Sequence, residues 1–254
     1  MIRISANLGF LWNELPLADA IRKAREAGFD AVECHWPYGE DGDGVKAALD
    51  ETGLPMLGLN TAKGQPGEFG LSALPGRQEE ARATIDKAVD YATRTGARAV
   101  HVMAGITDAA DAGVVFRENL VYACELAGRH HMTILIEPLN TRDVPGYFLT
   151  TLEQAADIIE RVGRMELKIM FDCYHMQIMG GDLLARYRHH RDAIGHVQFA
   201  AVPSRAEPGD GEVAFEWLLP AIAAEGYEGF FGAEYKPSGQ VEDGLDWMKA
   251  FRPA

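Results

Sequence analysis

Short runs of apolar residues alternate with amphipathic segments from one end of the chain to the other. The apolar runs are rich in β-branched and aliphatic side chains, as in strands buried on both faces, and we expect strands at residues 2–8, 30–34, 54–60, 97–103, 132–136, 167–171, 194–199 and 229–233. The segments between them carry apolar residues at helical spacing, which predicts helices at residues 16–27, 45–51, 77–95, 112–131, 151–162, 182–191, 215–225 and 242–251. The pattern is one strand and one helix, repeated eight times.

Eight βα units in 254 residues match the usual size of a (β/α)8 TIM barrel, about 250 residues. The alternative, a doubly wound open sheet, normally carries a glycine-rich phosphate-binding turn after its first strand. Here the first apolar run continues into NLGFLWNE, which has one glycine and no such pattern. No linker or shift in composition divides the chain, so we predict an α/β fold with a single barrel domain over residues 1–254.

Polar side chains of the kind that bind metal ions stand at the ends of the last four apolar runs: Glu137, Asp172, Gln198 and Glu234. They are about one βα unit (~30 residues) apart, and the carboxyl ends of all barrel strands meet at one face. Three carboxylates brought together would repel one another unless a cation lies between them. Because the potential ligands are all oxygens, Mg²⁺ or Mn²⁺ is favoured over zinc.

Each of these four residues also has a structural interpretation when it is taken alone. Glu137 fits a salt-bridged barrel acid, Asp172 a helix N-cap, Gln198 a hydrogen-bonded core amide and Glu234 a surface acid. The coincidence of all four at consecutive strand ends is what favours a divalent metal site.

The charge and the cysteines exclude several classes of protein. A formal net charge of −14 disfavours binding to nucleic acid or to anionic membranes, both of which depend on clustered lysine and arginine. The three cysteines are widely spaced and form no C-x-x-C pair, so we expect free thiols in a reducing compartment. No apolar run approaches the ~20 residues of a membrane span, and the start of the chain lacks the features of a signal peptide. We therefore expect a cytoplasmic protein that binds a small molecule.

Several short motifs resemble one known family. They are EPLN from Glu137, DCYH from Asp172, HVQ from His196, EYKP from Glu234, ALPGR at residues 73–77 and HVMAG at residues 101–105. Together they are similar to the hydroxypyruvate isomerase family, which belongs to the xylose isomerase-like TIM barrels with the ketose 3-epimerases. The resemblance covers essentially the whole chain.

The resemblance implies an isomerase that converts hydroxypyruvate to tartronate semialdehyde through a metal-stabilised enediolate. By position, Glu137, Asp172, Gln198 and Glu234 match the metal ligands, and the two glutamates also match the residues that move protons. His175 matches a histidine that contacts a substrate oxygen. The substrate itself is less specified, because Ala206 and the second strand, which reads CHWPYGED, depart from the family pattern near the expected mouth.

Further residues are candidates for binding the substrate. Arg205 matches a substrate-binding arginine of the epimerase relatives, and Lys236 is a second cation that would suit a substrate carboxylate. His101, at the end of the fourth apolar run, fits either a core histidine or a substrate contact. Asn7 and Asn60, at the ends of the first and third runs, could hydrogen-bond substrate hydroxyls.

Other functions stay open at this point. A 2-oxo-tetronate isomerase or a ketose 3-epimerase would use the same proton shuttle on a longer substrate, either a 2-oxo acid or a sugar. An apurinic-site endonuclease shares the barrel but needs a histidine-rich zinc cluster and a basic groove, which this composition does not favour. A barrel that binds metal without catalysis is the last alternative. The state of assembly is open, and a homo-oligomer is compatible with the sequence.

Overall fold

A computed structural model describes residues 2–252. Its strands are all parallel and adjacent in the order β2-β1-β8-β7-β6-β5-β4-β3. The strands are β1 (Ile4–Asn7), β2 (Ala31–Glu33), β3 (Gly58–Asn60), β4 (Ala99–His101), β5 (Thr133–Ile136), β6 (Leu167–Asp172), β7 (Ile194–Phe199) and β8 (Phe231–Ala233). Parallel neighbours in chain order are what a strand–helix repeat produces.

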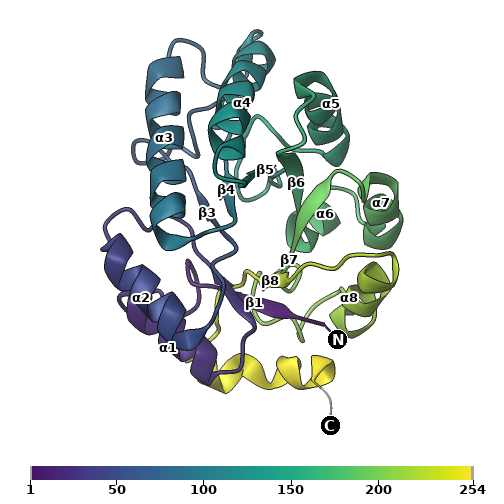
Figure 1. The fold of residues 1–254 in the computed structure, drawn as a ribbon. Coiled ribbons are helices and arrows are strands. Elements are labelled where there is room, and N and C mark those ends of the chain that lie inside the picture. The colour runs from purple at the N-terminus through teal and green to yellow at the C-terminus, as the bar shows by residue number, and fades with distance from the viewer. Residues whose placement is uncertain (1, 253–254) are drawn as a thin grey trace.

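Helices connect the strands and surround them (Figure 1). They are α1 (Leu17–Glu26), α2 (Gly42–Thr52), α3 (Gln78–Thr95), α4 (Ala112–Gly128), α5 (Leu152–Val162), α6 (Cys173–Met179), α7 (Leu183–His190) and α8 (Phe215–Ala224), followed by the 3₁₀ helix η1 (Val241–Phe251). The seam of the barrel lies between β2 and the segment before β3. There Val32 bridges Met56, and the Cys34 amide donates a hydrogen bond to the Gly58 carbonyl. The predicted (β/α)8 barrel is therefore confirmed.

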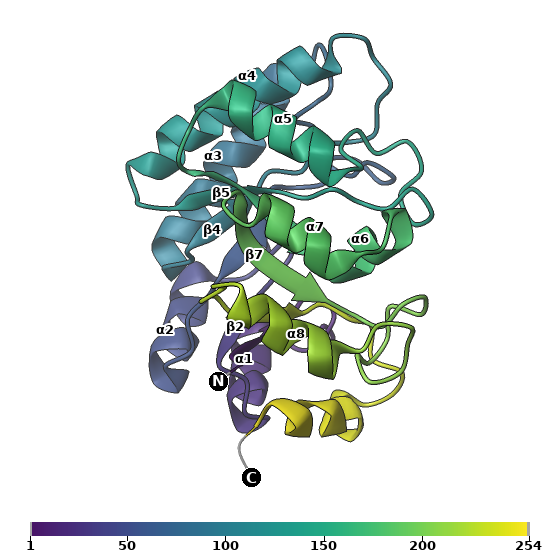
Figure 2. The same ribbon diagram turned by 90° about the vertical axis from the view of Figure 1, so that its right-hand side faces the viewer.

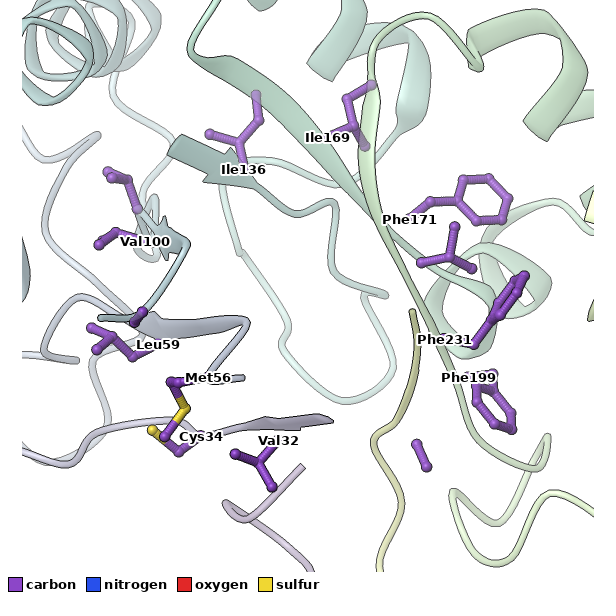
Figure 3. Packing of buried hydrophobic residues seen from close by; sticks show 14 of the residues in the cluster. Val32, Cys34, Met56, Leu59, Val100, Ile136, Ile169, Phe171, Phe199 and Phe231 are labelled. Carbon is purple, nitrogen blue, oxygen red and sulfur yellow. The ribbon is translucent and has the colours of Figure 1, made fainter. Parts of the chain in front are cut away.

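Alternate residues of each strand face two different environments. Ile136, Phe171, Phe199 and Phe231 belong to a large apolar cluster that the strands share with the surrounding helices (Figure 3). The neighbours of these residues point to the other side, the lumen of the barrel, where Leu135, Met170 and Ala99 form a small separate cluster. The lumen is otherwise occupied largely by polar side chains, so hydrophobic packing outside the strands carries most of the core.

Two features at the ends of strands and of the chain differ from the prediction. Helix α6 was not among the predicted helices, although a helix N-cap was one interpretation of Asp172. The helix starts directly after β6, where Asp172 Oδ1 accepts a hydrogen bond from the Tyr174 amide at 2.8 Å. The final helix is present but is a 3₁₀ helix. It is held by packing, with Trp247 edge-on against Phe199 and Tyr235.

Seen from the side, the arrow of β7 points toward the end of the barrel where the long loops gather (Figure 2). This is the carboxyl end of the strands, the usual site of catalysis in a TIM barrel. None of the helices in the described part of the chain is long and apolar enough to cross a membrane. The expected cytoplasmic location and any homo-oligomer stay predictions.

Candidate active site

The four predicted metal ligands come from four neighbouring strands. Glu137 directly follows β5, Asp172 ends β6, Gln198 lies in β7 and Glu234 directly follows β8. Asp172 and Gln198 are register partners across β6 and β7. All four side chains are buried, with exposures between 1% and 7%. The barrel thus brings acids from distant parts of the sequence to one end of its lumen, as the spacing predicted.

Three of these four residues hold an oxygen that no group in the described part of the chain satisfies. Glu137 Oε1, Asp172 Oδ2 and Gln198 Oε1 are buried and have no hydrogen-bond partner within residues 2–252. Buried acceptors without partners are rare, because each loses its hydration without compensation. Glu137 and Asp172 also form, with His175, a group whose potential ligand atoms, one from each residue, lie within 4.8 Å of one another. Unsatisfied buried oxygens on neighbouring strands, two of them from this group, fit a hard divalent cation.

The pKa values of the three buried acids are shifted in opposite directions. Desolvation, reinforced by the charge of Glu234, raises the pKa of Glu137 well above its usual range. Desolvation also raises the pKa of Asp172, to about 7, against the opposing effect of the Arg205 charge. For Glu234 burial is outweighed by the hydrogen bond with His35 and by Arg205, so its pKa falls to about 2. The protein alone therefore provides enough positive charge for Glu234 but leaves Glu137 and Asp172 under-compensated.

Arg205 is the cation closest to this cluster within the described chain. Its Nη2 lies 3.1 Å from Glu234 Oε1 and 3.7 Å from Asp172 Oδ2. The guanidinium is held between the rings of Phe10 and Tyr174, with its Cζ 5.1 and 5.0 Å from their centroids. Its backbone has φ +56°, a strained value for a residue with a side chain, and such strain is common at functional sites. The structure fixes Arg205 firmly beside the carboxylates.

His175 faces the cluster with a hydrogen-bond donor. Its Nδ1 accepts a hydrogen bond from the backbone amide of Asn140 at 3.0 Å, and burial lowers the pKa of the imidazole to about 3. A neutral imidazole whose Nδ1 is an acceptor carries its proton on Nε2. That Nε2 lies 3.6 Å from Asp172 Oδ2 and 3.8 Å from Glu137 Oε1. A protonated nitrogen cannot ligate a metal, so His175 suits donation to a substrate oxygen better than metal binding.

Asn140 itself is held in one orientation. The Asn140 Oδ1 accepts a hydrogen bond from the Asp143 amide, so its Nδ2 is directed to Asp143 Oδ2 at 3.1 Å and to His175 Nδ1 at 2.7 Å. Tyr174 donates to the same Asp143 oxygen at 2.8 Å. The loop after Glu137 therefore orients the His175 imidazole.

The remaining predicted substrate contacts lie in different surroundings. His101 is in the site, with Nδ1 3.6 Å from Glu137 Oε2, and burial lowers its pKa to about 4. Asn60 and Lys236 line the mouth cavity, and the Lys236 side chain is exposed there. Asn7 is occupied by the framework: its Nδ2 donates to Glu33 and its Oδ1 accepts from the Gly9 amide. A substrate contact of Asn7 stays a prediction.

Three residues of the site were not singled out from the sequence: Glu33, His35 and Lys63. Glu33 ends β2 after two buried apolar residues, the same signal that marked Glu137, and the sequence could have revealed it. His35 Nε2 lies 3.1 Å from Glu234 Oε1, across 199 residues of chain. Lys63 Nζ stacks 3.8 Å from the ring centroid of Trp36 and 5.0 Å from that of Phe69. The contacts of His35 and Lys63 become visible only in the folded chain.

The side chains surround a cavity of about 410 Å³ at the mouth of the barrel. Its lining residues include Glu137, Glu234, His101, His175, Arg205, Lys63 and Lys236. Three carboxylates (Glu137, Asp143 and Glu234), neutral histidine donors and cations thus border one space large enough for a small polar molecule. Such a set can move a proton and stabilise negative charge on an oxygen.

Comparison with known proteins agrees with this geometry. The sequence profile described as "Xylose isomerase-like TIM barrel" matches residues 21–251. The chain belongs to this family. Within the xylose isomerase-like TIM barrels it is similar to the 2-oxo-tetronate isomerase of Cupriavidus necator, with 40% identity over 99% of both chains. It is also similar to the hydroxypyruvate isomerase of Escherichia coli, with 38% identity over 99% of this chain and all of that one. The resemblance inferred from the motifs is confirmed.

Solved structures show the same barrel. A crystal structure from Brucella melitensis described as AP endonuclease, family 2, superposes with a TM-score of 0.95 at 39% identity and covers all of both chains. The D-psicose 3-epimerase of Clostridium cellulolyticum has a TM-score of 0.79, at 18% identity over 99% of this chain and 90% of the other. The second likeness concerns the fold alone.

Proposed function

We propose that this protein is an isomerase of small 2-oxo acids that interconverts hydroxypyruvate and tartronate semialdehyde, or the corresponding four-carbon pair. The observation that carries the proposal is the convergence of two buried glutamates, Glu137 and Glu234, on one cavity that also holds neutral histidine donors. The full-length relatives named hydroxypyruvate isomerase and 2-oxo-tetronate isomerase support an isomerase.

The reaction moves one proton between adjacent carbons. One glutamate takes the proton from the hydroxyl-bearing carbon beside the carbonyl, and the electron pair of that bond forms the enediolate. A proton is then delivered to the former carbonyl carbon by the second glutamate, while the hydroxyl proton passes to the other oxygen. Exchange with solvent removes the proton from the first glutamate and restores the one that the second has given up. His175, through its Nε2 proton, and His101 are placed to hydrogen-bond the oxygens on which negative charge develops.

A divalent metal fits the donor set. Glu137, Asp172, Gln198 and Glu234 would hold it, because three of them present buried oxygens that lack hydrogen-bond partners within residues 2–252. Mg²⁺ or Mn²⁺ suits such all-oxygen ligation. When bound, the ion would act as a Lewis acid that lowers the energy of negative charge on the substrate oxygens.

The substrate carboxylate has cations available at the mouth. Arg205 is already engaged by Glu234 and Asp172, so we assign the main role to Lys63. The rings of Trp36 and Phe69 hold its ammonium at the cavity, and it forms no ion pair with another residue in the described range. Lys236, exposed at the rim, is a second contact.

The endonuclease description of the Brucella structure does not transfer to this site. DNA-cleaving barrels of that type need a multi-zinc cluster and a basic surface, whereas the group of metal-ligand side chains found in residues 2–252 contains one histidine. The chain also carries a formal net charge of −14, which opposes phosphate binding.

Proton NMR in D₂O tests the proposal and separates it from the epimerase alternative. The purified protein with Mg²⁺ or Mn²⁺ is incubated with hydroxypyruvate, 2-oxo-tetronate, D-fructose and D-psicose. We expect a 2-oxo acid to form its aldehyde isomer. Deuterium should then enter the hydroxyl-bearing carbon and the adjacent former carbonyl carbon. Exchange in the ketoses alone would establish an epimerase instead, and exchange in none of the four compounds would refute the proposed chemistry.

A further inference from the structure

A buried hydrogen-bond network lies in the lumen beside the carboxylate cluster, and its central residue has no role in the proposed reaction. Its centre is Glu33 of β2, whose carboxylate accepts hydrogen bonds from four side chains: Ser5, Asn7, His196 and Gln198. The shortest contacts are with His196 Nε2 at 2.7 Å and with Gln198 Nε2 at 2.8 Å. Glu33 is 4% exposed, and these hydrogen bonds compensate for the hydration that its carboxylate loses on burial.

The network determines which end of the Gln198 amide faces the site. The group of Gln198 that meets Glu33 is the NH₂, because Nε2 donates a hydrogen bond to the carboxylate oxygen Oε1 of Glu33. The Gln198 oxygen is thereby directed away from Glu33. It is buried and finds no partner in the described part of the chain, and Gln198 borders a lumen cavity together with Glu137 and Glu234.

The Glu33 carboxylate and the Gln198 amide meet in a space that is kept open by a glycine. A Cβ on Gly232 of β8 would lie 2.6 Å from Glu33 Oε1 and 2.9 Å from Gln198 Cγ, both well inside van der Waals contact. Gly232 and Gln198 are register partners, so the absence of a side chain on β8 leaves room for the amide to reach across to β2. Three strands therefore cooperate to hold one side chain.

We propose that Glu33 is a positioning residue that holds the Gln198 amide with its oxygen toward the metal-binding carboxylates. The inference rests on the proposed metal site and adds how its one neutral ligand is oriented. Without Glu33 the amide would rotate freely between presenting an oxygen, which binds a hard cation, and an NH₂ group, which repels it. Partners of metal ligands that fix their orientation typically change metal affinity by about 10- to 100-fold when they are removed.

A double-mutant cycle on metal affinity tests the proposal without substrate. The Kd for Mn²⁺ is measured by electron paramagnetic resonance for the wild type, Glu33→Met, Gln198→Met and the double variant. If Glu33 acts through Gln198, Glu33→Met weakens Mn²⁺ binding about ten-fold or more, but has little further effect once Gln198 is already Met. An equal loss in both backgrounds would mean that Glu33 acts by its charge alone and would overturn the proposal.

Matched variants separate positioning from loss of folding. Ser5→Ala removes a different donor to Glu33, leaves Gln198 untouched and should change the Mn²⁺ affinity less than three-fold, roughly 0.6 kcal/mol. Gly232→Ala should weaken Mn²⁺ binding while the circular dichroism spectrum is kept, because the added Cβ meets the carboxylate and the amide. Full Mn²⁺ affinity in Gly232→Ala would count against the proposal.

A measurement on the unaltered protein avoids any folding defect of Glu33→Met. The protein is labelled with ¹⁵N at the side-chain amides of glutamine, and the Gln198 signal is identified by its loss in Gln198→Met. Its NH₂ protons should exchange slowly with water, both before and after Mg²⁺ is added. Rapid exchange of this group would show that Glu33 does not hold it. Absence of any Mn²⁺ binding by the wild type would remove both the metal site and this role, whereas failure of the deuterium experiment alone would leave them standing.

Discussion

The two sides of the barrel strands contrast in chemistry although they are built from adjacent residues. Phe171 faces outward into the large apolar cluster and stacks edge-on against Tyr187 of α7. Its neighbour Asp172 faces inward, and one of its oxygens has no hydrogen-bond partner within residues 2–252. The outer side is closely packed, whereas the lumen holds a cavity of about 240 Å³ bordered by polar groups.

This difference indicates that stability and chemistry are separated along each strand. Outward residues bury apolar surface, which stabilises the fold. Inward residues at the carboxyl ends bury charge, which destabilises the protein unless a ligand compensates it. A substitution should therefore affect folding or function according to the direction of its side chain, even between neighbours in sequence.

The largest expected effect is the loss of a proton-transferring glutamate from the lumen. Glu137→Gln and Glu234→Gln should each lower turnover of the 2-oxo acid by about 10²- to 10⁴-fold, the usual contribution of a general acid or base. Turnover is measured by the rate of isomer formation, and unfolding is followed in parallel. Glu79→Gln, on the exposed face of α3, is the matched control and should be fully active. If both lumen variants turned over like the control, the two-glutamate mechanism would be wrong.

An outward residue should show the opposite behaviour. Phe171→Ala should cost about 3–5 kcal/mol of unfolding free energy, since it leaves a cavity in a packed cluster. Met170→Ala should cost less, near ~2 kcal/mol, because Met170 already borders the lumen cavity. Denaturant unfolding of both variants checks the order. A larger loss for Met170→Ala would contradict the assignment of the main core to the outer side.

The charge in the lumen should make the metal-free protein sensitive to high pH. The raised pKa values of Glu137 and Asp172 mean that the folded state holds protons which the unfolded chain releases near pH ~4. The stability from these protons is complete at low pH and is lost as the pH rises through the folded-state pKa values. His101 and His175, with lowered pKa values, contribute in the opposite sense, but their contribution is complete above about pH 6.5.

The loss from Asp172 is complete once the pH passes its folded-state pKa of about 7, and Glu137, whose pKa is raised well above its usual range, contributes in the same direction. In the presence of a chelator, unfolding free energy should fall by up to about 1.4 kcal/mol per pH unit, and Mg²⁺ should cancel much of the fall. Thermal melts between pH 6 and 9, with and without Mg²⁺, provide the measurement. Glu137→Gln should reduce this pH dependence, and an unchanged slope in that variant would place its origin elsewhere.

The smallest effect is expected at the mouth, where solvent screens charge. Lys63→Met should raise KM for a 2-oxo acid about five-fold with little change in kcat, as for a partly exposed ion pair worth ~1 kcal/mol. Lys236→Met is the control at a more exposed position and should have a weaker effect. Equal KM values for the wild type and Lys63→Met would move the carboxylate site away from Lys63.

For two residues the structural interpretation of the sequence is confirmed at one atom, while a second atom of the same side chain is left for the proposed ligand role. For Asp172 the sequence allows a helix cap or a metal ligand; its Oδ1 caps α6, and its Oδ2 is unsatisfied within the described chain. For Gln198 it allows a core amide or a ligand; its Nε2 donates to Glu33, and its Oε1 lacks a partner in the same range. A structural role and a proposed ligand role can therefore belong to two different atoms of one side chain.

The sequence by itself determined the barrel and the set of acids at its mouth. Apolar periodicity and strand-to-strand spacing are local properties, and a regular βα repeat converts them into one three-dimensional arrangement. The tertiary structure alone decided how those acids are held: Glu33 meets Gln198 across 165 residues, and His35 meets Glu234 across 199. Such contacts depend on side-chain direction and on space left by residues such as Gly232, which follow from packing of the whole barrel and not from any local pattern.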